Sequence, residues 1–203
     1  RKRATITNCF RLYKIRGKKT SLNTLQEIAA FIVSNGKGIL AADESNPTCG
    51  KRFDSIGVES SESNRRDYRE MLFRSSGMKD NIGGVILFDE TIRQDAKDGT
   101  SLVQVISDQG ALPGIKVDQG LKPLDGSPEE TLTQGLEGLH DRCSEYFQLG
   151  AKFTKWRAVI KIGNNLPTDN CIDANMKALA VYAKVVHQHV TYTHLTLPTN
   201  REL

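Results

Sequence analysis

The sequence has no apolar run of membrane-spanning length and lacks the motifs of the common nucleotide-binding enzymes. No G-x-x-x-x-G-K-[ST] motif occurs, and "GGVILF" at 83–88 gives no dinucleotide-binding fingerprint. The four cysteines are widely spaced without a C-x-x-C pair, which argues against a zinc ribbon or a redox pair. We therefore expect reduced cysteines in a cytosolic, globular protein.

Acidic residues are absent from the first 26 positions, which carry eight Lys or Arg. The rest of the chain has 20 basic against 24 acidic residues, so its body is mildly acidic. Such a lead can be a nucleic-acid arm, a targeting segment or sequence outside the true protein. Because the chain opens on Arg rather than Met and has no long apolar segment here, we prefer a fragment end, with a targeting arm as the alternative.

Clustered histidines are also missing. His187 and His189 lie two apart in a predicted helix and cannot face one metal ion together, and His140 stands alone, so we expect no metal site. Basic residues of the body are not interleaved with aromatic ones, which gives no support for nucleic-acid binding.

Apolar runs of strand length alternate with helical patterns along the body. Strands are predicted at "GILAA" (38–42), "GGVILF" (83–88), "PGIKVD" (113–118) and "AKFTKWRAVI" (151–160). Helical stretches precede the first strand and follow each of the four. This order favours a parallel sheet with right-handed crossovers, either doubly wound or closed as a barrel.

For two of the predicted helices the sequence also indicates where they begin or end and which residues they use there. One begins at "GSPEE", where Ser127 caps it and Pro128 occupies its first turn, and it runs to Gly150. The last reaches about His189, with the buried stripe Ile172, Met176, Leu179, Ala183 and Val186.

Polar side chains gather at the carboxyl ends of the predicted strands, where α/β proteins place their chemistry. Asp43 ends the first strand, Lys116 lies in the third, and Lys155 and Arg157 lie two residues apart on one side of the fourth. Such cations suit a phosphate ester, and their crowding would lower the pKa of a lysine and favour Schiff-base chemistry. Alternatively, each cation is a solvated rim charge and Asp43 caps the segment that follows.

Six segments together carry a resemblance. In order, "GKGILAADES", "NRRDYR", "GGVILFDET", "GIKVDQG", "TLTQGLEGL" and "AKFTKWRAVIKIG" resemble class I fructose-bisphosphate aldolase over residues 21–190. That family has a (β/α)8 TIM-barrel fold, so the resemblance implies an α/β chain with the first four or five β/α units of a barrel. Residues 1–20 would be a basic lead outside the folded domain, and residues 191–203 a tail that does not belong to the family.

The resemblance implies a glycolytic and gluconeogenic lyase. It would cleave fructose 1,6-bisphosphate reversibly to dihydroxyacetone phosphate and glyceraldehyde 3-phosphate through a lysine Schiff base, without metal or cofactor. Asp43 is expected to orient the reacting sugar and Lys155 to assist cleavage of the carbon–carbon bond. The expected substrate- and phosphate-binding residues are Ser45, Thr48, Arg52, Arg65, Lys116 and Arg157.

The family would continue into a fifth strand with an acidic pair and a sixth strand with the Schiff-base lysine. Neither occurs in the sequence, which ends in "TYTHLTLPTNREL". We interpret this tail as the product of a broken gene model, a frame change or a sequencing artefact. A chain that truly ends so is expected to be inactive and poorly soluble alone.

The resemblance also implies a cytoplasmic homotetramer for the intact family member, with a sugar phosphate as substrate and neither nucleic acid nor membrane as partner. The alternative is a non-catalytic truncated barrel that binds sugar phosphate or pairs with full-length subunits. A phosphate-binding barrel enzyme of another kind would leave the six coinciding segments unexplained.

Overall fold

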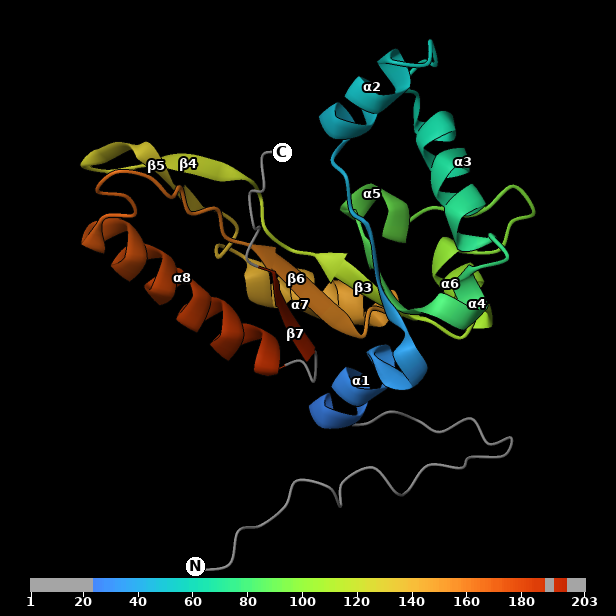
Figure 1. The fold of residues 1–203 in the computed structure, drawn as a ribbon. Helices are drawn as coiled ribbons and strands as arrows, with labels where there is room; N and C mark the ends of the chain where they lie inside the picture. Colours follow the sequence, from blue (N-terminus) through green and yellow to red (C-terminus); the bar gives the residue numbers. More distant parts are fainter. Residues whose placement is uncertain (1–23, 189–191, 197–203) are drawn as a thin grey trace, which may run out of the picture.

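The computed structural model describes residues 24–188 and 192–196. Its main feature is a five-stranded parallel sheet, in the order β1-β2-β3-β6-β7, accompanied by an antiparallel hairpin of β4 and β5 (Figure 1). The strands are β1 (Gly38–Ala42), β2 (Ile82–Leu87), β3 (Leu112–Lys116), β4 (Leu121–Leu124), β5 (Ser127–Thr133), β6 (Phe153–Arg157) and β7 (Tyr192–Thr196).

Helices precede the first strand of the sheet and connect the strands that follow. They are α1 (Leu25–Ile32), the 3-10 turn η2 (Ser34–Gly36), α2 (Asn46–Asp54), α3 (Glu62–Phe73), α4 (Met78–Asn81), α5 (Asp89–Ile92), α6 (Leu102–Asp108), α7 (Leu139–Gln148) and α8 (Asp169–His187). The first begins at a capping box, in which Thr24 and Glu27 each accept a hydrogen bond from the other's main-chain N–H.

The strand order decides between the two predicted architectures. Neighbouring strands of the sheet follow the chain without a reversal, and all their pairings are parallel. A doubly wound sheet would reverse its order at a switch point, whereas a barrel adds each strand beside the previous one. The prediction of an open segment of a (β/α) barrel is therefore confirmed.

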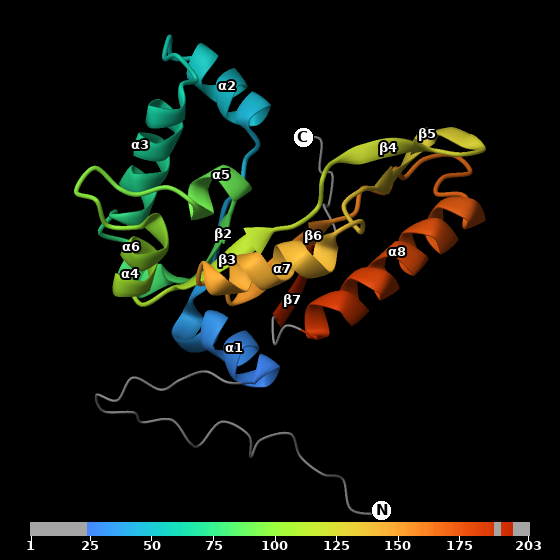
Figure 2. The same cartoon turned by 180° about the vertical axis from the view of Figure 1, so that it is seen from behind.

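The larger core lies between the sheet and the helices outside it. Figure 2 shows α7 and α8 running along this outer side. Trp156 points outward from β6 and stacks, tilted, on Tyr182 of α8 at 5.1 Å between ring centroids. Both side chains are buried, together with Phe73 of α3 and Leu102 of α6. Burial of these apolar side chains is what holds the helices on the sheet.

A smaller core lies on the other face of the sheet. Ile28 and Ile32 of α1 pack there against Ile86 of β2 and Phe153 of β6. The approach is close enough to require glycine at position 83, because a methyl group there would lie 2.0 Å from the carbonyl oxygen of Ile32. Helix α1 thus covers the inner face at the end of the sheet away from the β4–β5 hairpin (Figures 1 and 2).

The helix predicted from Ser127 is wrong over its first half. Residues 127–133 form strand β5, which pairs antiparallel with β4, and helix α7 begins only at Leu139. The turn between the strands contains Asp125 and Gly126, the latter at φ 78°, a conformation that glycine adopts without strain. An Asp-Gly pair is a recognised hairpin signal, and here it prevails over the capping signal of Ser127 and Pro128.

The predicted buried stripe of the last helix is also partly wrong. Ile172 and Met176 are 43% and 46% exposed, whereas Cys171 and Asn175, each one position earlier, are buried. The amide of Asn175 can be buried because it donates to the main-chain carbonyls of Thr131 and Cys171. The spacing of apolar residues therefore predicted the wrong face of α8 as the buried one at the start of the helix.

The expected domain limits stay predictions. The basic lead, residues 1–20, lies outside the described residues, as does most of the expected tail. Within that tail, however, Tyr192–Thr196 form β7, which pairs in parallel with β6 over its whole length.

Candidate active site

A cavity of about 870 Å³ lies at the carboxyl ends of β1, β3 and β6. Seven of the eight residues expected at a substrate site line it, and these are Asp43, Ser45, Thr48, Arg52, Lys116, Lys155 and Arg157. Arg65 is not among the lining residues. The lining also includes Glu44, Arg93, Asp118, Arg142 and Tyr146, which the sequence did not assign to a site.

Lys155 and Asp43 form the central ion pair of the cavity. The ammonium nitrogen of Lys155 on β6 lies 2.6 Å from Oδ2 of Asp43, which directly follows β1. Two strands, β2 and β3, separate β1 from β6 in the sheet, so the pair spans its concave side. Both side chains are largely buried, at 14% and 9% exposure. The pair therefore places a proton donor beside a hydrogen-bond acceptor, and both side chains are largely shielded from solvent.

Lys116 has its own carboxylate partner. Its ammonium nitrogen lies 2.9 Å from Oδ1 of Asp118 and donates to the main-chain oxygen of the same residue at 3.1 Å. The two lysines of the cavity are therefore each neutralised by an aspartate. Several cations do line this cavity together, and the effect of their crowding on a lysine stays a prediction.

Arg157 differs from these lysines. No hydrogen bond or ion pair of its side chain is found within the described residues, and it lines the cavity as an exposed residue. Trp156, the next residue back, is fully buried on the opposite face of β6. The guanidinium thus offers its planar donor fork to an anion in the cavity.

The β1–α2 segment supplies hydroxyl groups and a second arginine. The hydroxyls of Ser45 and Thr48 lie 3.1 Å apart. Arg52 pairs with the carboxylate of Glu44 and donates to the Tyr68 hydroxyl at 3.1 Å. The negative charge of Glu44 raises the pKa of Arg52.

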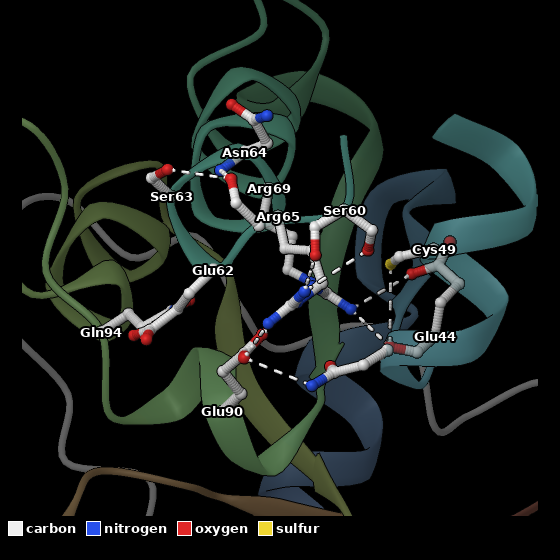
Figure 3. Close-up of polar contacts among 12 residues, drawn as sticks. Glu44, Cys49, Ser60, Glu62, Ser63, Asn64, Arg65, Arg69, Glu90 and Gln94 are labelled. Carbon is white, nitrogen blue, oxygen red and sulfur yellow. Dashed lines mark hydrogen bonds and ion pairs between the residues drawn. The ribbon is translucent and has the colours of Figure 1, made fainter. Parts of the chain in front are cut away.

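Arg65 is placed away from the cavity lining. It forms a bidentate pair with Glu90 of α5, with Nε–Oε2 2.8 Å and Nη2–Oε1 2.6 Å, and also donates to the main-chain carbonyl of Ser60 (Figure 3). Its hydrogen bonds lower the pKa of Glu90. In this geometry Arg65 holds α3 on α5, and its expected contact with substrate stays a prediction.

Arg69 holds the main chain on both sides of Asp43. It is fully buried, and it donates from Nε to the carbonyl of Ala42 at 3.0 Å. It also donates from Nη2 to the carbonyl of Glu44 (Figure 3). Sequence reasoning missed it because arginine is rarely fully buried and a helix is expected to bury its apolar residues, such as Met71. Met71 is in fact 61% exposed, and the helix buries Arg65, Arg69 and Phe73. The only signal was the four-residue spacing of the two arginines.

A second polar cluster was also missed, on α5 and α7 at the edge of the cavity. Arg93 pairs with Asp89 at 2.9 Å and with Glu145, and the Tyr146 hydroxyl donates to Asp89 at 2.8 Å. Burial, together with this bond to Asp89, raises the pKa of Tyr146 to about 12. The phenol therefore stays protonated at neutral pH and acts as a fixed donor.

Among residues 24–188 and 192–196, no group of three His, Cys, Asp or Glu side chains could hold a metal ion. In the same part of the chain, no helix is both long and apolar enough to cross a membrane. Cys49, Cys143 and Cys171 are free and buried.

Comparison with known proteins gives consistent results. Residues 24–192 match the family model "Fructose-bisphosphate aldolase class-I". The chain is 51% identical over 168 residues to a probable fructose-bisphosphate aldolase class 1 of Xanthomonas campestris pv. campestris, covering 83% of this chain and 50% of the relative. It is 53% identical over 166 residues to fructose-bisphosphate aldolase C-A of Danio rerio, covering 81% of this chain and 46% of the relative.

A solved structure agrees. The fructose-bisphosphate aldolase of Plasmodium falciparum, in complex with TRAP and a small-molecule inhibitor, superposes with a TM-score of 0.80 at 42% identity, covering 84% of this chain and 51% of that one. The chain spans about half the length of the curated relatives it matches.

Proposed function

Because the chain belongs to the class I fructose-bisphosphate aldolase family, we propose that the whole protein cleaves fructose 1,6-bisphosphate reversibly to dihydroxyacetone phosphate and glyceraldehyde 3-phosphate. The observation that carries the proposal is the Lys155–Asp43 pair at 2.6 Å, inside a cavity that the Arg157 guanidinium also lines.

The Lys155–Asp43 pair acts on the reacting carbons. Cleavage of the bond between C3 and C4 converts the C4 hydroxyl into an aldehyde, so that hydroxyl must lose its proton. The carboxylate of Asp43 accepts a hydrogen bond from a substrate hydroxyl and orients it. The proton passes to an acidic residue of the fifth strand that the family resemblance implies, and the electron pair of the C3–C4 bond passes to the Schiff base. The ammonium of Lys155 stabilises the negative charge that grows on the oxygen meanwhile, which is worth most in a site shielded from water.

The cations around this pair hold phosphate. Arg157 and Lys116 face the cavity from β6 and β3, and Arg52 faces it from α2 with the hydroxyls of Ser45 and Thr48 nearby. Arginine binds a phosphate with two donors at once, whereas lysine contributes a point charge. Arg65 can join these residues only by leaving Glu90.

The Schiff-base lysine of this proposal lies outside residues 24–192. A polypeptide of these 203 residues alone would therefore not cleave the sugar. The whole protein would be a homotetramer. Its compartment would be the cytoplasm, as the name of the Arabidopsis thaliana relative "Fructose-bisphosphate aldolase 6, cytosolic" states for that protein.

Two assays test the proposal. In the whole protein, release of glyceraldehyde 3-phosphate from fructose 1,6-bisphosphate is followed with a coupling dehydrogenase, and chelator should leave the rate unchanged. The same substrate is titrated calorimetrically into the whole protein, where heat of binding is expected together with turnover. A whole protein that binds the sugar but never cleaves it would favour the non-catalytic alternative.

A further inference from the structure

Strand β6 extends beyond its neighbour β3 at the cavity. In the register of the two strands Lys116 is paired with Lys155, and β3 ends there. The main-chain N–H of Val117 still donates to the carbonyl of Lys155 at 3.0 Å. Arg157, two residues further along β6, has passed the end of its partner strand, so its main-chain groups on that side need other partners.

Two buried side chains supply these partners. The N–H of Arg157 donates to Oδ2 of Asp118 at 3.3 Å, and its carbonyl accepts from the hydroxyl of Thr133 at 2.7 Å. Thr133 belongs to the β4–β5 hairpin and is 3% exposed, and Asp118 is 8% exposed. Asp118, just after β3, and Thr133, on the hairpin, thus take the place of the strand partner that β3 no longer provides. One binds the main-chain N–H of Arg157 and the other its carbonyl.

This main-chain support matters because the Arg157 side chain finds no polar partner within the described residues. Lys116, Lys155 and Arg52 are each oriented by a carboxylate. Among the described residues, no polar side chain orients the guanidinium of Arg157, so its position depends on its backbone. A displacement of about 1 Å at such a group is enough to weaken a two-point contact with an anion.

We propose that Thr133 is a positioning residue, which sets the affinity of the cavity for the phosphate group that Arg157 binds. The inference rests on the proposed function, because it takes a phosphorylated sugar as the ligand. It adds a role for the β4–β5 hairpin, whose Thr133 hydroxyl acts through the carbonyl of Arg157 without touching the ligand.

The test is calorimetric titration of fructose 1,6-bisphosphate and, separately, inorganic phosphate into the whole protein. Thr133→Val keeps the shape of the side chain and removes its hydroxyl. Loss of one buried hydrogen bond predicts a Kd about 3- to 10-fold higher. Thr133→Ser restores the hydroxyl and should restore the affinity, and Thr133→Ala serves if the valine variant does not fold.

Thr131→Val is the matched control. Thr131 lies two residues earlier on the same strand, and its hydroxyl donates to the carbonyl of Val159 at 3.3 Å, beyond the arginine. The Thr131→Val variant loses a hydroxyl-to-carbonyl bond of the same kind, longer than the 2.7 Å bond of Thr133, and should leave both Kd values unchanged. In an Arg157→Ala background, Thr133→Val should no longer change the affinity, because its effect passes through that side chain.

Three results would overturn the inference. They are an unchanged Kd in Thr133→Val, an equal loss in Thr131→Val, and an undiminished effect in the Arg157→Ala background. In each of them the unsubstituted protein still binds fructose 1,6-bisphosphate, so the proposed function survives. An unsubstituted protein that binds neither ligand would overturn both.

Discussion

At the scale of single residues, Lys155 is the side chain on which the proposed chemistry depends most. Its ammonium group reaches Asp43 from a strand that is not a neighbour of β1, and β6 carries no second lysine that could replace it. Lys155→Met in the whole protein should reduce kcat for cleavage by about 10²- to 10⁴-fold, the range for loss of a positioned acid–base group.

Lys161→Met is the control for that change. Lys161 is half exposed and pairs with Glu129 on the surface, so its loss should leave kcat unchanged. Thermal unfolding followed by circular dichroism shows whether each variant is folded. A folded Lys155→Met protein with normal kcat would contradict the role of this lysine.

Lys155 and Arg157 could be placed on one side of a strand from the sequence because side chains in strands alternate with a period of two. Arg69 could not be found in the same way. A charged residue is buried only when the fold brings acceptors to it, and the carbonyls of Ala42 and Glu44 come from a distant part of the chain. Arg65 was identified as a candidate by resemblance, but its partner Glu90 could not be inferred.

At the scale of elements, Glu130 connects the hairpin to helix α8. This buried carboxylate on β5 accepts hydrogen bonds from both the main-chain N–H and the hydroxyl of Thr168, the residue that caps α8. The hydroxyl bond in particular lowers the pKa of Glu130 below its ordinary value. Stability gained in this way is fully present above the ordinary glutamate pKa of about 4.3 and is lost as pH falls through the lower folded-state pKa.

Glu130→Gln should therefore lower the Tm of the whole protein at pH 7 by about 2–4 °C. The difference from the unsubstituted protein should shrink as the pH falls below about 4. Glu129→Gln is the control, because Glu129 is exposed and pairs only with Lys161 among the described residues. Equal shifts in the two variants, or a difference that grows at low pH, would show that Glu130 does not anchor α8.

Strands β1 and β2 were predictable because each is a continuous apolar run. Strands β3 and β6 were predictable although they also carry the charged residues Lys116, Lys155 and Arg157, because apolar residues flank these positions. The β4–β5 hairpin was not, since two local signals compete at residues 125–130. Asp125 and Gly126 favour a turn, and Ser127 and Pro128 favour a helix start. Pairing of Thr131 and Thr133 with β4 decides between them, and that pairing is a tertiary contact that local patterns do not contain.

At the scale of the whole molecule, the described residues form an open sheet. Among them, β1 pairs only with β2, so one edge of the sheet has no partner strand. A polypeptide of residues 21–190 expressed alone would leave edges unpaired and should associate through them. Light scattering should show aggregates, whereas a monomer with a sharp, cooperative thermal transition would contradict this expectation.

In the proposed mechanism two lysines have different roles: Lys155 assists bond cleavage, and another lysine forms the Schiff base. The most direct measurement is borohydride reduction of the whole protein in the presence of dihydroxyacetone phosphate, followed by mass-spectrometric mapping of the modified residue. One modified lysine outside residues 24–192, with Lys116 and Lys155 unmodified, is the predicted result. An adduct on Lys155, or no adduct on any lysine, would contradict the account.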